Sequence, residues 1–226
     1  YGAESYLTGL RRRYAAGAYS REHFAYLAAR AYLRINKPRR AVALLQSLDP
    51  LFAPTGHQPP VWILLAHART LRPSRPAECS LNMIARNEQD TLGQALDSVD
   101  TLVDEIVVCD TGSTDRTVEI ARLYGAKVVH FEWCNDFSAA RNHAIEAGSC
   151  EWILWMDADD RLAPRSRKPL QELWRSVPPQ CAFFCVSNEK HGDDGNRFLQ
   201  ARLFPRREDL RFERRIHEQI APRARR

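Results

Sequence analysis

Acidic and hydroxyl side chains gather in three short clusters of this sequence, each directly after an apolar stretch. The clusters are Ala85-Arg-Asn-Glu88, Asp110-Thr-Gly-Ser-Thr-Asp115 and Asp157-Ala-Asp-Asp160. Carboxylates accept hydrogen bonds from hydroxyl and N–H groups, and they also bind hard cations. If the clusters meet in space, their like charges repel, and a divalent cation is the simplest compensation.

Asp157 and Asp159 lie on the same side of an extended segment, because side chains alternate along a strand. Their oxygens are ligands of the kind that Mg²⁺ or Mn²⁺ takes, and such ions commonly bridge carboxylates to phosphate oxygens. An isolated pair of this spacing is equally typical of an acidic turn or a helix N-cap. The assembly with the other clusters is what favours a metal site.

Short β-branched runs alternate with helical patterns around these clusters. We expect strands over residues 80–84, 105–109, 127–131, 152–156 and 182–186, and helices over 90–99, 115–124 and 137–147. The first four strands, which alternate with these helices, are expected to pair in parallel through right-handed crossovers, which predicts an α/β protein with an open twisted sheet. Ligands of these sheets bind beyond the carboxyl ends of the strands, where the polar clusters lie.

Four motifs, in this order and spacing, resemble family 2 glycosyltransferases of the GT-A fold. They are Ala85-Arg-Asn-Glu88, Val108-Cys-Asp-Thr-Gly-Ser-Thr-Asp115, Asn135-Asp-Phe-Ser-Ala-Ala-Arg-Asn142 and Trp155-Met-Asp-Ala-Asp-Asp160. The resemblance is close over residues 79–162 and looser to about residue 220. It implies a Rossmann-like, mostly parallel sheet that binds a nucleotide-diphospho-sugar.

The resemblance implies roles for individual residues. Asp110 would accept the N3–H of uracil, and Glu88 would meet ribose hydroxyls. Asp159 would ligate Mg²⁺ or Mn²⁺, with Asp157 touching the ribose or the water shell of the ion. The implied nucleotide-sugar-binding set is Ala85, Asn87, Glu88, Asp110, Gly112, Ser113, Arg141, Asp157 and Ala158.

Two of these assignments have structural alternatives. Arg141 would lie near the base and the phosphates, or else pair with Asp136 or another acidic neighbour on its helix. Gly112 permits close backbone approach, whereas Ser113 and Thr114 serve equally well as caps of the next helix.

A catalytic base is expected late in the chain, because an inverting transferase must remove the proton of its acceptor. Arg215-Ile-His-Glu218 resembles the "HE" element of some family members, with Glu218 as the base and His217 as a ligand of the metal or the diphosphate. Alternatively, both residues lie on a charged surface. A second choice of base is a loop with these acidic and imidazole groups: Glu189, His191, Asp193 and Asp194.

The other histidines and the tryptophans are interpreted as structural. His23, His57, His67, His130 and His143 lack ligand spacing. Trp133, Trp152 and Trp155 have the size to stack on a sugar or a base, but their apolar neighbours favour packing in the core.

The first 76 residues are predicted to form a helical region that precedes an α/β domain over residues 77–226. Part of this region faintly resembles a tetratricopeptide repeat, but at most one and a half units are present. We expect the helices to cover one side of the larger domain, with binding of a protein partner or self-association as the alternative. The α/β domain is expected to lack some C-terminal sequence of the family.

Composition excludes several classes of protein. The 226 residues are 44% hydrophobic and 27% charged, which is typical of a globular protein, and no apolar stretch is long enough to span a bilayer. The net charge is +5, and the basic excess lies in residues 1–78. These basic residues are spread along helical patterns, which favours a solvated face over binding of nucleic acid or a membrane surface. The six cysteines form no CxxC pair, so we expect free thiols and a cytoplasmic setting.

The sequence as a whole predicts a metal-dependent, inverting glycosyltransferase that uses a nucleotide-diphosphate sugar, with UDP as the expected nucleotide. The acceptor is a saccharide, a lipid or a polypeptide. The alternative is a nucleotide-sugar-binding and protein-interaction module without turnover.

Overall fold

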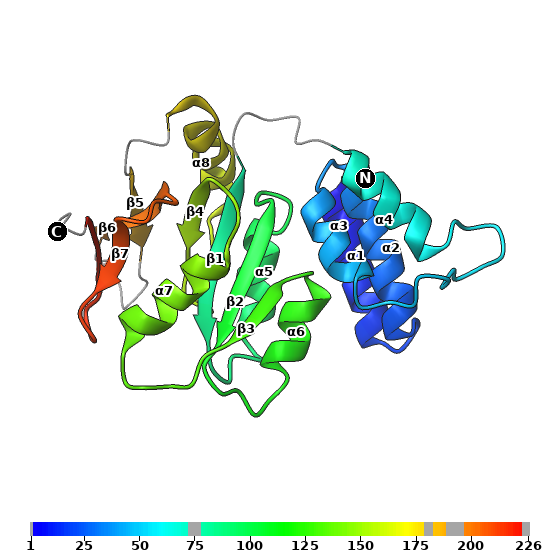
Figure 1. Cartoon of the computed structure of the whole chain (residues 1–226), viewed down its shortest axis with the longest axis horizontal. Coiled ribbons are helices and arrows are strands. Elements are labelled where there is room, and N and C mark those ends of the chain that lie inside the picture. The colour runs from blue at the N-terminus through cyan, green and yellow to red at the C-terminus, as the bar shows by residue number, and fades with distance from the viewer. Residues whose placement is uncertain (1, 72–77, 179–182, 189–196, 223–226) are drawn as a thin grey trace.

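The computed structural model describes residues 2–71, 78–178, 183–188 and 197–222. Its centre is a six-stranded sheet, in the order β3-β2-β1-β4-β6-β5 (Figure 1). The expected strands at 80–84, 105–109, 127–131 and 152–156 are confirmed to within two residues; they are β1 (Cys79–Ala85), β2 (Glu105–Asp110), β3 (Lys127–His130) and β4 (Trp152–Trp155).

The parallel pairing predicted for these four strands is also confirmed. Ala85 at the end of β1 lies beside Asp110 at the end of β2, and Asn82 lies beside Trp155 of β4. The sheet is completed by β6 (Arg197–Pro205), which runs antiparallel to both β4 and β5 (Phe183–Asn188). Residue 182, the expected start of the fifth strand, lies outside the described residues. The sheet is therefore mixed but mostly parallel.

Four helices flank the sheet: α5 (Leu92–Val99), α6 (Thr117–Leu123), α7 (Phe137–Ala147) and α8 (Pro164–Ser176). In Figure 1, α7 lies in front of β1 and β2, both of which it contacts, and α5 lies behind them. The Asp136 side chain caps α7, because its Oδ1 accepts the N–H of Ala139 at 3.0 Å. The start of α7 therefore falls where the sequence predicts it.

No expectation was made for α8 or for the strands β6 to β8. Pro169 lies inside α8, and an internal proline argues against a helix in a sequence pattern. The helix forms because Leu170 and Trp174 are buried against the main core of the sheet.

A short hairpin, β7 (Leu210–Glu213) and β8 (Gln219–Pro222), packs on α7. Asn142 of α7 makes two hydrogen bonds to Phe212 of β7: Oδ1 accepts its N–H and Nδ2 donates to its carbonyl, each at 2.9 Å. Phe212 also joins the apolar cluster of Ile145, Ile153 and Trp155. These contacts fix the turn of the hairpin, residues 214–218, close to the start of α7.

The N-terminal region is helical, as predicted, and consists of α1 (Ala3–Ala15), α2 (Arg21–Arg34), α3 (Pro38–Leu45) and α4 (Val61–Thr70). Consecutive helices pack on one another around a hydrophobic cluster of their own, in which Phe24, Tyr26 and Tyr32 are fully buried. Figure 1 shows these helices on the side of the molecule opposite the hairpin.

Buried ion pairs hold the N-terminal helices against the α/β region. The Asp100 carboxylate, 2% exposed, lies 2.6 Å from the guanidinium of Arg40 and 2.7 Å from that of Arg11, and it accepts the hydroxyl of Tyr32. Lys37 pairs with Asp104 at 2.6 Å. The helices thus cover the end of α5 and the start of β2.

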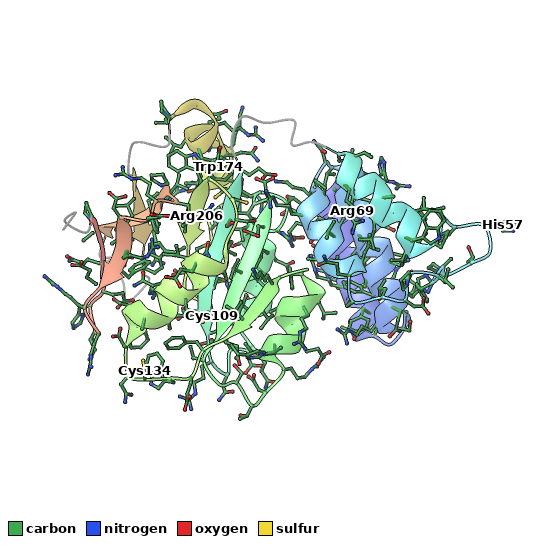
Figure 2. The ribbon with its side chains drawn as sticks, in the orientation of Figure 1. His57, Arg69, Cys109, Cys134, Trp174 and Arg206 are labelled. Carbon is green, nitrogen blue, oxygen red and sulfur yellow. The ribbon has the colours of Figure 1, made fainter. Side chains whose placement is uncertain are left out.

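The cysteines whose side chains the structure describes are free thiols, as predicted. Cys79, Cys109 and Cys150 are free and buried, whereas Cys134 is exposed. In Figure 2, Cys109 lies in the sheet beneath α7 and Cys134 lies on the loop that precedes this helix. Among the helices that the structure describes, none has the length and apolar character needed to cross a membrane.

Candidate functional site

The polar loops that follow β1, β2 and β4 meet at the carboxyl edge of the sheet, as expected, and border a pocket of about 380 Å³. Six of the residues predicted to bind a nucleotide sugar or a metal line it: Ala85, Glu88, Arg141, Asp157, Ala158 and Asp159. Five further residues line it that the sequence analysis did not assign to the site: Ile84, Arg86, Thr111, Trp133 and Phe137.

The loops after β1 and β2 support each other through side-chain hydrogen bonds. Ser113 Oγ accepts the N–H of Asn87 at 3.0 Å, and Asn87 Oδ1 accepts the N–H of Thr114 at 2.8 Å. Asn87 has a positive φ of 56°, which an asparagine tolerates better than most residues. Neither Asn87 nor Ser113 is part of the described pocket lining, so both brace the loops that carry Glu88 and Thr111.

Gly112 has a φ of 104°, which only glycine adopts without strain, and no atom lies within 4 Å of the point that a Cβ would occupy. It allows the tight turn after β2. It does not line the described pocket.

Asp110 is buried beneath this edge, with 4% of its surface exposed. Its Oδ1 accepts the N–H of Ser113 at 3.1 Å, and its Oδ2 lies 3.2 Å from Nδ1 of His130. Both carboxylate oxygens therefore have a partner in the protein. His130, which the sequence analysis interpreted as structural only, is a direct neighbour of the residue expected to bind the base.

Two hydrogen bonds between Asp157 and Asp160 stabilise the turn that these residues form. Asp160 Oδ2 accepts the N–H of Asp157 at 3.0 Å, and the N–H of Asp160 donates to the carbonyl of Asp157 at 3.1 Å. Burial raises the pKa of Asp160 above its ordinary value, although Arg202 lies 2.8 Å away. Asp159, by contrast, is exposed on this turn and borders the pocket.

Two arginines neutralise part of this acidic cluster. Arg141 donates to Asp157 Oδ1 and to Glu218 Oε1, each at 2.7 Å, and Arg202 lies 3.6 Å from Asp157 Oδ2. Both guanidinium groups stack on the ring of Trp155, 4.2 Å and 3.9 Å from its centroid. Arg202 was not identified from the sequence, because it comes from β6, outside the four motifs.

The alternative partner that the sequence offered for Arg141 is not the one observed. Asp136 caps α7 instead, and Arg141 is 7% exposed between two acidic residues from other elements. One of these is Glu218, the expected base. It is 77 residues from Arg141 in the sequence, and the fold brings the two side chains into contact.

The turn at residues 214–218 is held by the start of α7. The N–H of Phe137 donates to the carbonyl of Arg215 at 3.1 Å, and the Ser138 hydroxyl donates to the carbonyl of Arg214. Glu218 is half-buried in this turn, whereas His217 is exposed. In Figure 2, His57 projects from the far end of the loop between α3 and α4.

Within the described ranges, no three His, Cys, Asp or Glu side chains form a cluster suited to a metal ion. His217 is thus not gathered with Asp157 and Asp159 into the expected ligand set. The alternative residues Glu189, His191, Asp193 and Asp194 lie outside the described part of the chain.

Trp133 is not a core residue, contrary to the expectation. It is half-buried and lines the pocket, because it lies on the loop between β3 and α7. Trp152 and Trp155 are buried, as predicted.

The family model described as "Glycosyl transferase family 2" matches residues 80–224. A TPR repeat-containing protein of Synechococcus elongatus is 41% identical over 150 residues, which cover 64% of this chain and 36% of that protein. The SPbeta prophage-derived glycosyltransferase SunS of Bacillus subtilis is 29% identical over 140 residues, 61% of this chain and 33% of SunS. The chain spans about a third of the length of these curated relatives.

Solved structures with similarity include S. aureus TarS in complex with UDP, at 25% identity and a TM-score of 0.38, covering 42% of this chain and 31% of that chain. Glucosyl-3-phosphoglycerate synthase from Mycobacterium tuberculosis in complex with UDP has 29% identity and a TM-score of 0.35, covering 38% of this chain and 35% of that chain.

Proposed function

Because the chain belongs to glycosyl transferase family 2, with the mostly parallel sheet of the GT-A fold, we propose that it transfers a sugar from UDP to an acceptor hydroxyl or other nucleophile with inversion. The observation that carries the proposal is the pocket at the carboxyl edge of the sheet, where Glu88, Arg141, Asp157 and Asp159 converge from two loops and a helix. The acceptor is a saccharide, a lipid or a polypeptide.

The donor is proposed to lie across the ends of β2, β1 and β4. Glu88 offers carboxylate oxygens to ribose hydroxyls at the pocket wall. Asp110 is proposed to accept N3–H of uracil, for which an oxygen now facing Ser113 or His130 must be shared. Arg141 supplies a fork of donors for phosphate oxygens.

The acidic cluster fits a divalent cation by charge. Asp157, Asp159, Asp160 and Glu218 are four carboxylates, and Arg141 and Arg202 are two guanidinium groups, so two formal negative charges are left over. Asp159 is the exposed carboxylate of the set, and we propose it as the ligand of Mg²⁺ or Mn²⁺. Such an ion, when bound, neutralises charge on the departing diphosphate. Asp157 already contacts two arginines, so its proposed role is toward the ribose or the water around the ion.

Glu218 is proposed as the general base. It would take the proton of the acceptor while the acceptor oxygen forms its bond to C1 of the sugar and the bond from C1 to the diphosphate breaks. One displacement on the face opposite the leaving group inverts the configuration at C1. The ion pair with Arg141 holds the Glu218 carboxylate at the pocket, ready for this role.

The N-terminal helices are proposed to act as a cover of the α/β region over residues 77–226, because their buried ion pairs face it. Binding of a protein partner or self-association through these helices is the alternative to this role. The TPR-like character of the helices and a cytoplasmic setting are proposed as well.

The first experiment is thermal unfolding with UDP, GDP, ADP and CDP, each with and without Mn²⁺. A ligand that binds only the native state must raise the unfolding temperature. We expect a Mn²⁺-dependent rise with UDP, which Asp159→Ala abolishes and Glu172→Ala, an exposed carboxylate on α8, leaves intact. An unchanged UDP response in Asp159→Ala would refute the metal assignment.

A second experiment separates transfer from binding. Release of UDP from UDP-sugars, with water or with candidate acceptors, measures turnover. A UDP response without any turnover would favour the alternative, a nucleotide-sugar-binding module.

A further inference from the structure

Two aromatic side chains form an apolar part of the pocket wall, among mostly charged neighbours. Trp133 and Phe137 meet edge to face, with ring centroids 4.9 Å apart and planes at 73°. Phe137 is 38% exposed and Trp133 is half-buried, so neither ring is enclosed by the core. Aromatic surface that is left accessible inside a polar pocket is available to a flat or apolar part of a ligand.

The ring of Trp133 is held in position before any ligand arrives. Its indole N–H donates to Asn135 Oδ1 at 3.0 Å, so the one polar group of the side chain is already satisfied. Phe137, the ring it touches, is the first residue of α7, and its N–H is fixed to the carbonyl of Arg215. Trp133 therefore presents ring surface, not a hydrogen-bond donor, to the pocket.

The backbone places Trp133 near Asp110. His130, the last residue of β3, lies in register with Asp110, and the N–H of Phe131 donates to the Asp110 carbonyl at 2.9 Å. Trp133 follows two residues later on the same loop. It is thus close to the residue proposed to hold the nucleobase.

The opposite end of the pocket belongs to the acidic turn. Asp157 and Asp159 follow β4, and in the order β3-β2-β1-β4 the ends of β3 and β4 are three strand spacings, or about 14 Å, apart. A nucleoside diphosphate laid across the ends of β2, β1 and β4 has its phosphates near the acidic turn and its base near Asp110, beside the end of β3. The transferred sugar, attached to the phosphates, then lies at the acidic end.

We infer that Trp133 is the platform on which the nucleobase of the donor stacks, and that Phe137 fixes the plane of this platform. The inference rests on the proposed donor site and names its base-binding residue. Removal of a ring that stacks on a base lowers affinity by about 5- to 150-fold, which corresponds to the ~1–3 kcal/mol typical of such contacts.

The test compares Trp133→Ala and Trp133→Phe with wild type by titration calorimetry in Mn²⁺, using UDP and using pyrophosphate, which lacks a base. Trp62→Phe is the matched control, because Trp62 is an exposed tryptophan on α4. We expect Trp133→Ala to weaken UDP binding about 5- to 150-fold and to leave pyrophosphate binding and ligand-free thermal unfolding unchanged. Trp133→Phe restores most of the loss, and Trp62→Phe changes nothing.

The outcomes separate this inference from the proposed function. Equal affinity of wild type and Trp133→Ala for UDP overturns the platform alone. A matching loss for UDP and pyrophosphate makes Trp133 a structural residue and also overturns it. Trp133→Ala could instead bind UDP normally but lose the additional affinity that a UDP-sugar has over UDP. That result would mean that the ring stacks on the sugar and not on the base. If wild type binds no UDP, the proposed function and this inference both fail.

Discussion

The guanidinium of Arg141 holds the Glu218 carboxylate in the free protein. Its Oε1 accepts Nε of Arg141 at 2.7 Å, and the same guanidinium holds Asp157, so one buried arginine joins the proposed base to the acidic turn. The amide of glutamine can still accept this hydrogen bond but cannot take a proton. Glu218→Gln therefore keeps the position of the side chain and removes only its ability to act as a base.

We predict that Glu218→Gln lowers the rate of UDP release from a UDP-sugar by about 10²- to 10⁴-fold, the usual contribution of a general base. The Mn²⁺-dependent thermal response to UDP should persist in this variant. Glu213→Gln, an exposed glutamate in the same hairpin, is the control and should keep full turnover. Normal turnover in Glu218→Gln would remove Glu218 from the mechanism.

Burial also determines which thiols of the protein react. It raises the pKa of Cys109 and of Cys150 to about 12, so neither forms thiolate near neutral pH, whereas Cys134 is exposed. We predict that Cys134→Ser removes one equivalent of rapid labelling by a disulfide reagent such as DTNB in the native protein. Cys109→Ser should leave the rapid phase unchanged; a smaller rapid phase there would show that β2 opens readily.

At the scale of elements, α7 links the two halves of the proposed site. It carries Arg141 toward the pocket, and through Asn142 and its N-terminal turn it holds the β7–β8 hairpin that bears Glu218. The hairpin has only two short strands, which alone are marginally stable, so its position depends on this helix.

We predict that Asn142→Ala destabilises the protein by about 1–3 kcal/mol, because the N–H and carbonyl of Phe212 lose their partner. Turnover should fall more than UDP affinity, since the displaced element carries the base and not the donor site. Urea unfolding and UDP titration measure the two effects. Gln94→Ala, at an exposed position on α5, is the control; equal losses of turnover in both variants would contradict this coupling.

At the scale of the whole molecule, the N-terminal helices are joined to the α/β region through charge. Arg40 is 1% exposed and donates to Asp100 and to the carbonyl of Tyr124. Removal of one partner from a buried ion pair leaves the other charge without compensation.

We predict that Arg40→Met lowers the free energy of unfolding by about 3–5 kcal/mol. Urea denaturation checks this, with the exposed Arg12→Met as the control; equal stabilities of wild type and Arg40→Met would mean that the Arg40–Asp100 pair does not stabilise the docked helices.

The ion pairs of Asp100 also make the free energy of unfolding depend on pH. Burial by itself would raise the pKa of Asp100, but Arg11, Arg40 and the Tyr32 hydroxyl outweigh it and hold the pKa below its ordinary value of 3.8. A lowered pKa in the folded state contributes stability that is complete above the unfolded value and is lost as the pH falls through the folded value.

We therefore predict that the stability difference between wild type and Asp100→Asn is constant above about pH 5 and narrows as the pH falls below about 4. Urea unfolding at a series of pH values measures this difference. Asp90→Asn, at an exposed position, should show no such trend. A constant difference down to pH 2 would mean that the pKa of Asp100 is the same in the folded and the unfolded protein.

The sequence by itself determined the parallel strands, their helices and the edge at which the polar loops meet. These features follow from local patterns: β-branched runs, helical spacing and caps such as Asp136 all act within a few residues. The donor side of the candidate site was predicted for the same reason, because Glu88, Asp157 and Asp159 lie directly after strands.

Only the tertiary structure decided which distant residues meet. Arg202 reaches Asp160 from β6, Glu218 reaches Arg141 from the hairpin, and Trp133 turns to the pocket instead of the core. The contact of Asp100 with Arg11 and Arg40 likewise joins residues 60 or more apart in the chain. Such pairings depend on the burial and the relative placement of whole elements, and no local pattern of the sequence encodes them.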